Sequence, residues 1–497
     1  MAASDSLPRS SSSSSLYKQS AAANMMPPEP GAIPRNSSVH SFRAPFLSPA
    51  SRPTSSLWSP PSYNTQHVLT PSPNASTTAL QISKSKPPLP STRLPAPIPK
   101  SDKPWLTTPE PRTHLSYTIT LFCLFLGAAG AAIFCWRGVV ETQALILRDS
   151  DLCQVLDEDF SSGTLNSATW KREVELGGFG NGEFQMTTAD SNNLFFRNSQ
   201  LYLYPTLTSD TVPHVLGGGN YTLPGCTSSN KTACIAISNN ALGTVINPVM
   251  SARINTKDKV GIKFGKVQVR AKLPRGDWLH PQILLLPTSS PYGAFPTSGL
   301  MTLLSARGNS PSPLYPTLGS DHVTSSLTFG PFPALISTLY GIVTASRRSP
   351  FSEAFHIYTM EWTEDFIRFS VDDRTRSMLL TQTPKGGKGK KGAYWDKAAF
   401  PETARNGSDN KVVVQNPYES KGGGRAAPFD QTTFYLTIAL GAGGTSGWFP
   451  DEMGGTPGQP SAKPWYDGSP NAMRDFARAQ DVWSRTWPGE DDRSFRM

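Results

Sequence analysis

Residues 115–136, LSYTITLFCLFLGAAGAAIFCW, form a run of 22 residues without a charged side chain. At the helical rise of 1.5 Å per residue such a run is about 33 Å long, which is enough to cross the hydrocarbon core of a bilayer. A buried core helix is the alternative, but the length and the uniform apolarity favour a transmembrane helix. A cleaved signal peptide is not expected, because more than a hundred residues precede the run. The chain is therefore expected to place separate segments on the two sides of a membrane.

Residues 1–114 are rich in Ser and Pro and contain no sustained apolar run. A segment of this composition buries too little apolar surface to offset the entropy lost on ordering, so we predict a disordered tail. The tail has eleven Lys or Arg and four Asp or Glu, and its net charge is +7 of the chain's +9. The rest of the chain is near neutral and has no zinc-finger spacing or RNA-binding motif, so nucleic acid is not an expected partner. The sequence indicates no partner for the tail.

The charges on the two sides of the apolar run predict its orientation. Six Lys or Arg and two acidic residues lie between residues 84 and 112, whereas residues 137–151 carry two basic and three acidic residues. Because the more positive flank is retained in the cytosol, residues 1–114 are predicted to be cytosolic. Residues 137–151 then form a stalk, and residues 152–489 form a domain in the lumen of the secretory pathway or at the cell surface. This is the topology of a single-pass type II membrane protein.

Cysteines and glycosylation sequons are consistent with that orientation. Cys226 and Cys234 enclose a short polar loop and are expected to form a disulfide in an oxidising lumen, with two free thiols as the alternative. Cys153 has no evident partner. Three sequons lie beyond the apolar run and are candidate glycosylation sites, namely Asn220, Asn230 and Asn406. The sequons at residues 36 and 74 would face the cytosol.

From about residue 152 the sequence changes to short alternating segments separated by Gly, Pro, Asn and Asp. Residues 265–272, 366–371 and 433–440 are examples in which apolar and polar side chains alternate. A period of two with frequent turn residues predicts an all-β domain, an antiparallel sandwich of many strands. Only residues 472–480 have the pattern of a short helix.

The segment 298–309, SGLMTLLSARGN, resembles the active-site strand of the family 16 glycoside hydrolases, in the laminarinase and β-1,3-glucan-recognition branch. In that family the frame reads roughly Ser-Gly-Glu-Ile-Asp-Ile-Met-Glu-Ser-Arg-Gly-Asn. Further blocks resemble the family in the same order, at residues 157–160, 180–185, 265–279, 355–363, 428–431 and 469–476. The resemblance covers residues 152–489 and implies a concanavalin A-like β-jelly-roll sandwich with a sugar-binding cleft across one sheet.

The three carboxylate positions of the family frame are occupied by Leu300, Thr302 and Ser305. The resemblance implies a nucleophile at 300, a carboxylate that orients it at 302 and an acid/base at 305. Positions 300 and 302 share one face of a strand, and position 305 joins that face only through a β-bulge, which the family frame contains. Retaining glycoside hydrolysis needs two carboxyl groups. Because these three positions supply none, we predict that the chain lacks the catalytic residues of the family.

Other positions around the implied cleft have also changed. His280 and Leu284 replace two cleft aromatics of the family, and Phe329 replaces a downstream Trp. The resemblance, and the preference of sugars for aromatic faces and hydrogen-bonding side chains, give six candidate substrate-binding residues, with Trp278 and Trp448 favoured among the aromatics. For each the alternative is core or loop packing. The candidates are Glu183, Trp278, His280, Tyr292, Arg307 and Trp448.

The leading hypothesis is a membrane-anchored family 16-like pseudoenzyme that binds β-glucan or acts in wall glucan assembly, as in the similar membrane-anchored fungal proteins. One alternative is an active β-glucan hydrolase or transglycosylase that uses displaced carboxylates such as Glu183. Another is a membrane scaffold without glycan affinity. No cofactor or transition metal is expected, because no such ligand spacing or phosphate loop is present. A structural Ca²⁺ is compatible with the resemblance, but no ligands for it are identifiable.

Overall fold

The computed structural model describes residues 96–104, 111–312, 315–345, 350–383, 393–407, 411–420, 428–454 and 462–497. The chain divides into two units, Met1–Thr107 and Thr108–Met497. In the first unit the described residues include one 3₁₀ turn, η2 (Lys100–Asp102). Residues 1–95 of the predicted tail lie outside the described residues, so their disorder stays a prediction.

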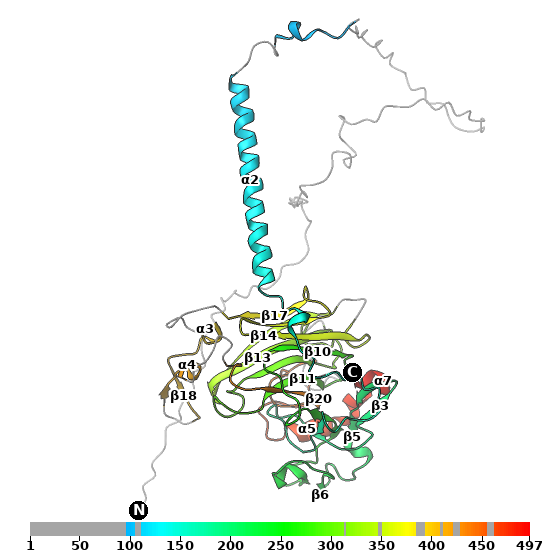
Figure 1. Ribbon diagram of the computed structural model, residues 1–497. Coiled ribbons are helices and arrows are strands. Elements are labelled where there is room, and N and C mark those ends of the chain that lie inside the picture. Colours follow the sequence, from blue (N-terminus) through cyan, green and yellow to red (C-terminus); the bar gives the residue numbers. More distant parts are fainter. Residues whose placement is uncertain are drawn as a thin grey trace, which may run out of the picture. The chain divides into compact units, whose positions relative to one another are not determined.

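Helix α2 (Pro111–Gln143) contains the whole predicted transmembrane run (Figure 1). It is 33 residues long, so it extends beyond residues 115–136 at both ends and takes in part of the predicted stalk. Pro111 suits the first turn, where a helix has no use for the missing backbone N–H. No residue of the helix is buried, and it is long and apolar enough to cross a membrane. These properties separate it from a core helix, whose apolar side chains would be covered by protein.

The second unit contains a sandwich of two antiparallel sheets (Figure 1). The larger sheet has seven strands, in the order β1 (Lys171–Arg172), β9 (Arg253–Asn255), β20 (Phe434–Ala442), β11 (Leu279–Pro287), β12 (Leu300–Ala306), β13 (His322–Phe332) and β14 (Leu335–Thr344). The smaller sheet has four strands, in the order β10 (Gly265–Ala271), β15 (His356–Trp362), β16 (Phe366–Val371) and β17 (Ser377–Gln382). The all-β sandwich predicted from the alternating pattern is confirmed.

Shorter elements surround the sandwich. One small sheet has three strands, in the order β2 (Gln185–Thr187), β8 (Val249–Ser251) and β5 (Thr206–Leu207). Another has the order β21 (Phe495–Arg496), β4 (Gln200–Leu203) and β3 (Leu194–Arg197). Two hairpins pair β6 (Gly219–Thr222) with β7 (Ile235–Ser238) and β18 (Thr403–Arg405) with β19 (Lys411–Val413). Because β21 pairs with β4 and Phe495 is fully buried, the fold continues past residue 489, where the predicted domain ended.

The helices of the domain are short. They are α3 (Ala393–Ala398), α4 (Pro417–Ser420), α5 (Ala472–Arg478), α6 (Gln480–Trp483) and α7 (Glu490–Arg493), with 3₁₀ turns η3 (Asp149–Asp151), η4 (Thr208–Asp210), η5 (Lys231–Cys234) and η6 (Ser484–Thr486). Helix α5 agrees with the short helix predicted over residues 472–480.

The hydrophobic core lies between the two sheets. From the larger sheet, Met301 and Leu303 of β12 are completely buried, and from the smaller sheet Met360, Trp362 and Phe369 are equally buried. Each side chain of this size contributes about 1.5–3 kcal/mol by leaving water. The core thereby fixes which face of β12 points inward and leaves the opposite face of the larger sheet for a ligand.

Candidate functional site

A cleft of about 910 Å³ lies on the face of the larger sheet opposite the core. Its floor comes from β11, β12, β13 and β14, and loop residues 179–181 and 446–448 also line it. The volume is in the range of sites that hold small ligands. Among the described residues that line this cleft none is Asp or Glu, and the positive charges are Arg253 and Arg307.

A β-bulge shapes the central strand of the cleft. In the pairing of β12 with β13, Thr302 lies opposite Ser326 and Ser305 lies opposite Thr324. Two residues of β12 therefore face one residue of β13, and the alternation of the strand is shifted by one position. This is the bulge that the sequence frame predicts.

The bulge brings the three family carboxylate positions to one face. Leu300, Thr302 and Ser305 all line the cleft, while Leu303 and Leu304 are completely buried in the core. The three positions therefore share one face of the sheet, as the bulge in the sequence frame implied. Where a glycosidase of this family would carry its catalytic carboxylates, this chain presents an apolar side chain and two hydroxyls.

His280 connects the cleft to a buried carboxylate. Its Nε2 lies 2.7 Å from Ser305 Oγ, and its Nδ1 lies 3.2 Å from Glu183 Oε1. Glu183 also accepts hydrogen bonds from Gln185 Nε2, at 2.6 Å, and from Gln282 Nε2. Glu183 is 4% exposed and does not line the cleft. It lies behind His280, so a direct contact with a sugar, which the sequence prediction assigned to it, does not fit this position.

The electrostatics of this network leave the imidazole neutral. Burial lowers the pKa of His280 below its ordinary value, and the charge of Arg307 acts in the same direction, although the hydrogen bond to Glu183 opposes them. Burial alone would raise the pKa of Glu183, but its hydrogen bond with His280 holds the pKa below the ordinary value. At neutral pH the pair is therefore a carboxylate and an uncharged imidazole.

Trp448, His280 and Arg307 form one wall of the cleft. The Trp448 ring is stacked on the His280 ring, with centroids 4.7 Å apart and planes at 16°. The Arg307 guanidinium carbon lies 3.8 Å from the Trp448 ring centroid, and Arg307 Nε donates to the Trp448 carbonyl at 2.9 Å. Burial lowers the pKa of Arg307 to about 10, so it remains cationic at neutral pH. These three sequence candidates are brought together at the cleft.

Two other candidates are core residues. Trp278 is 1% exposed and packs edge-on against Phe449 and Trp465, with centroids 5.4 and 5.1 Å apart. It precedes β11 with a φ of 67°, so the alternation of the strand does not determine its direction. Tyr292 is 5% exposed, and its hydroxyl donates to Asp430 at 3.1 Å. Neither residue lines the cleft, which corrects the sugar-stacking role predicted for both.

The structure also changes the set of cleft residues. Leu284 lines the cleft as expected, but Phe329 is completely buried against aromatic core residues, and its neighbour Thr328 faces the cleft instead. Sequence reasoning missed Tyr340 and Ile342, which line the cleft from β14. Their alternating pattern on an edge strand was the available signal.

Features outside the cleft also bear on the sequence predictions. Cys226 and Cys234 form the expected disulfide, and Cys153 is free and exposed. The sequon residues Asn220, Asn230 and Asn406 are exposed. Their glycosylation stays a prediction. Within the described ranges, no group of three or more His, Cys, Asp or Glu side chains is placed to hold a metal ion.

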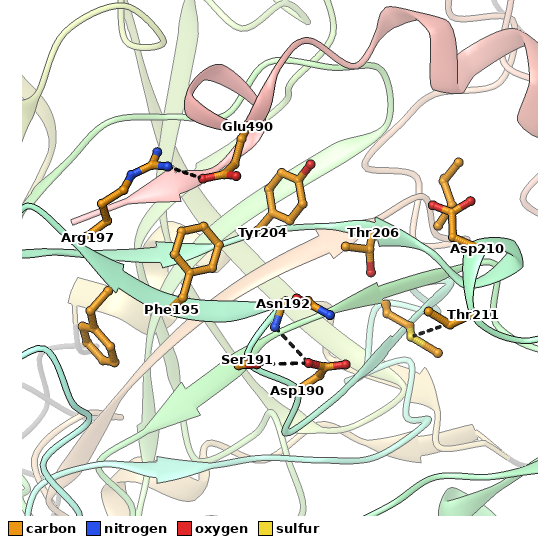
Figure 2. Close-up of a pocket in the computed structure, with 13 residues that line it drawn as sticks. Asp190, Ser191, Asn192, Phe195, Arg197, Tyr204, Thr206, Asp210, Thr211 and Glu490 are labelled. Carbon is orange, nitrogen blue, oxygen red and sulfur yellow. Dashed lines mark hydrogen bonds and ion pairs between the residues drawn. The ribbon is translucent and has the colours of Figure 1, made fainter.

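A second hollow, of about 550 Å³, lies beside β3 and β5 and shares no lining residue with the cleft. Figure 2 shows its polar side chains, including Arg197, whose Nη1 lies 2.7 Å from Glu490 Oε1, and Asp190, which accepts from the Asn192 backbone N–H at 2.9 Å. Arg197, Glu490 and Asp190 are thus engaged with other protein groups. This hollow contains none of the residues predicted to bind sugar.

No family model matches the chain. A β-1,3-glucan-binding protein of Penaeus monodon is 33% identical over 350 residues, which cover 69% of this chain and 86% of that protein. A β-1,3-glucan-binding protein of Tenebrio molitor is 29% identical over 343 residues, covering 67% of this chain and 62% of that protein. The chain thus spans about three fifths of the length of the Tenebrio relative.

Among solved structures, the chain is similar to the laminarinase catalytic domain of Thermotoga maritima, with 20% identity, a TM-score of 0.38, and coverage of 59% of this chain and 88% of that one. For the laminarinase of Rhodothermus marinus the identity is 20%, the TM-score 0.39, and the coverage 60% and 92%. The match to the Penaeus protein covers 86% of that protein at 33% identity, and on this evidence the chain belongs to the β-1,3-glucan-binding protein family.

Proposed function

We propose that the cleft binds a β-1,3-glucan and does not hydrolyse it. The observation that carries this proposal is the position of Leu300, Thr302 and Ser305, which line the cleft where the family frame has carboxylates. The names of the Penaeus and Tenebrio relatives, both β-1,3-glucan-binding proteins, support the choice of ligand. A role in wall glucan assembly, which the resemblance to fungal proteins implied, stays a prediction.

The side chains in the cleft support binding without glycoside cleavage. Retaining hydrolysis places two carboxyl groups about 5–5.5 Å apart on either side of the scissile bond. The described residues that line the cleft supply none, and the nearby Glu183 is held behind His280 by hydrogen bonds. The alternative of a hydrolase with displaced carboxylates therefore has no structural support.

Binding needs weaker and more numerous contacts than hydrolysis. The cleft presents Tyr340, which is 66% exposed, as an aromatic surface, and Trp448, whose ring packs against His280 and Arg307, as part of its wall. A row of hydroxyl side chains runs along β12, β13 and β14. Such hydroxyls can donate to or accept from sugar hydroxyls, while aromatic faces cover the apolar faces of the rings. The hydroxyl side chains are Thr302, Ser305, Thr324, Ser326, Thr328 and Thr338.

Binding is tested with the full chain in detergent micelles and soluble laminarin, by titration calorimetry. Trp448→Ala is expected to raise the Kd about tenfold or more, a loss of about 1.4 kcal/mol, because it removes a lining side chain that packs against His280 and Arg307 in the cleft wall. Tyr466→Ala is the matched control, since Tyr466 is 51% exposed and lies outside the cleft. Absence of laminarin binding by the unmodified chain, or equal affinity of the Trp448 variant, would refute the proposal.

Hydrolysis is tested in the same samples by the release of reducing ends from laminarin. We expect none above the buffer rate. Release that is abolished by Glu183→Gln would instead support the displaced-carboxylate alternative. The variant with Leu300→Glu, Thr302→Asp and Ser305→Glu tests the register, because any reducing ends it releases would come from carboxylates restored at the lining positions.

We further propose that the chain is a single-pass type II membrane protein with the β-domain on the luminal or extracellular side. Helix α2 is long enough to span, the charge asymmetry of its flanks favours a cytosolic tail, and a disulfide between Cys226 and Cys234 is typical of an oxidising compartment. Expression in secretory cells followed by endoglycosidase treatment tests this orientation. A mobility shift that is lost when Asn220, Asn230 and Asn406 are replaced by Gln is expected, and glycans on residues 36 or 74 would reverse the assignment.

A further inference from the structure

Three side chains from separate elements form a hydroxyl–imidazole–carboxylate series at the floor of the cleft. Ser305 Oγ of β12 lies 2.7 Å from Nε2 of His280 in β11, and His280 Nδ1 lies 3.2 Å from Oε1 of Glu183, just before β2. All three residues are less than 10% exposed, and both Ser305 and His280 line the cleft. The hydroxyl end of the series therefore faces the space that a ligand would occupy, and the carboxylate end is sealed from it.

The series joins two positions at which the chain departs from the family frame. Position 305 has Ser in place of the acid/base carboxylate, and position 280 has His in place of an aromatic residue. Unrelated losses at two sites would have no reason to produce a hydrogen-bonded pair. The two replacements instead form a single contact between neighbouring strands, with a buried carboxylate already in place behind it.

We propose that Ser305, His280 and Glu183 form a nucleophilic triad that cleaves O-acyl esters bound in the cleft. In the first step Ser305 Oγ attacks the acyl carbonyl carbon and its proton passes to His280 Nε2. The ester C–O bond then breaks, and the leaving alcohol takes that proton, so the acyl group is bonded to Ser305. Water attacks the acyl carbon, gives a proton to His280, and releases the carboxylic acid as Ser305 Oγ recovers the proton.

The protonation states in the cleft are suitable for this reaction. A neutral imidazole can accept the serine proton, and the Glu183 carboxylate can hold the tautomer whose hydrogen is on Nδ1. Arg307, the residue that follows β12, lines the same cleft and offers positive charge for the oxyanion that forms during attack. The absence of carboxylates among the described lining residues favours an uncharged or anionic substrate, such as an O-acylated sugar.

Gln282 competes with Glu183 for His280 Nδ1, so the tautomer of His280 decides whether Ser305 is activated. Its Nε2 lies 3.0 Å from His280 Nδ1 and also contacts Glu183. If Gln282 donates to Nδ1, the imidazole hydrogen is on Nε2, which then donates to Ser305, and the serine is not activated. If His280 donates to Glu183, Nε2 accepts from Ser305 and the triad is productive. The two arrangements give opposite results in the experiment below.

The experiment uses the full chain in detergent micelles with a fluorophosphonate probe and with p-nitrophenyl acetate, neither of which needs glucan affinity. We expect the probe to form a covalent adduct on Ser305, located by peptide mass mapping, and Ser305→Ala to abolish it. His280→Gln should slow p-nitrophenyl acetate hydrolysis about 100-fold or more, the contribution of a general base. Glu183→Gln should slow it as well, whereas Gln282→Leu, which removes the donor that competes for His280 Nδ1, should speed it.

A second series of the same connectivity provides a matched control. Thr344 Oγ1 lies 3.0 Å from His322 Nε2, and His322 Nδ1 lies 2.7 Å from Asp321 Oδ1, but these residues do not line the cleft. Thr344→Val should change neither labelling nor hydrolysis. The hydrolysis rate should also rise with pH through a pKa below the ordinary value for His, because burial and the charge of Arg307 lower the pKa of His280 by more than Glu183 raises it.

The outcomes separate this proposal from glucan binding. Ser305→Ala should abolish labelling while its unfolding midpoint matches that of the unmodified chain, and its loss of one of several lining hydroxyls should weaken laminarin binding less than Trp448→Ala does. An unlabelled Ser305 in a chain that binds laminarin would overturn the triad and leave the proposed function intact. Ester hydrolysis that is equal in the Ser305→Ala and unmodified chains would also overturn it.

Discussion

Glu361 is expected to be the most stabilising single carboxylate of the smaller sheet. It lies in β15, its side chain is 1% exposed, and it is paired with two arginines. Arg368 Nε, from β16, donates to Oε2 at 2.6 Å, and Arg374 Nη2 donates to Oε1 at 2.6 Å. The arginines differ in solvent exposure, because the side chain of Arg368 is 9% exposed and that of Arg374 is 42% exposed.

The substitution Glu361→Gln retains the shape of the side chain and removes its charge. Arg368 then keeps a buried guanidinium without a carboxylate, although its Nη2 still donates to the Leu145 carbonyl at 3.0 Å. Breaking a buried ion pair in this way costs about 3–5 kcal/mol, and the remaining carbonyl contact favours the lower end, about 3 kcal/mol. Arg374→Gln removes only the partly exposed arginine and leaves Glu361 paired with Arg368, so it should cost about 1 kcal/mol or less.

The free energy of unfolding is measured by urea denaturation of the chain in detergent micelles, followed by tryptophan fluorescence. The expected order is a large loss for Glu361→Gln and a small loss for Arg374→Gln, with unchanged dependence on urea concentration. A loss below about 1 kcal/mol for Glu361→Gln would refute the reasoning from burial. An equal loss for the two variants would show that exposure does not distinguish the two pairs.

Three further predictions concern the pH response, the core and the disulfide. Burial raises the pKa of Asp277 to about 6, so the folded state binds the extra proton between about pH 4 and 6, and stability falls as the pH rises through that window. Asp277→Asn should therefore raise the free energy of unfolding by about 3 kcal/mol at pH 7 and by less than about 1 kcal/mol at pH 4, measured by urea denaturation at both values. Trp278→Ala should cost about 3–5 kcal/mol in the same assay, as expected for a core residue and not for a sugar-stacking one. Replacing Cys226 and Cys234 by Ser should lower the free energy of unfolding by about 2 kcal/mol. When the unmodified chain is alkylated without reduction, its mass should show that these two cysteines have not been alkylated.

The sequence by itself determined the features that depend on local pattern. The uncharged run at 115–136 predicted helix α2, because length and apolarity alone decide whether a helix can span a bilayer. Alternating segments predicted the sandwich, and the frame at 298–309 predicted the bulge that puts Leu300, Thr302 and Ser305 on one face. The absence of catalytic carboxylates follows directly from residue identity.

The tertiary structure decided which side chains reach the cleft and which partners they meet. Trp278 was assigned to the cleft from its neighbours, but a positive φ just before β11 turns it into the core, and no strand pattern encodes that rotation. The contact of Ser305 with His280 joins residues 25 apart in sequence, and Glu183 completes the series from a third element. Such contacts arise only when strands pair, because strand pairing and not sequence spacing sets the distance between their side chains.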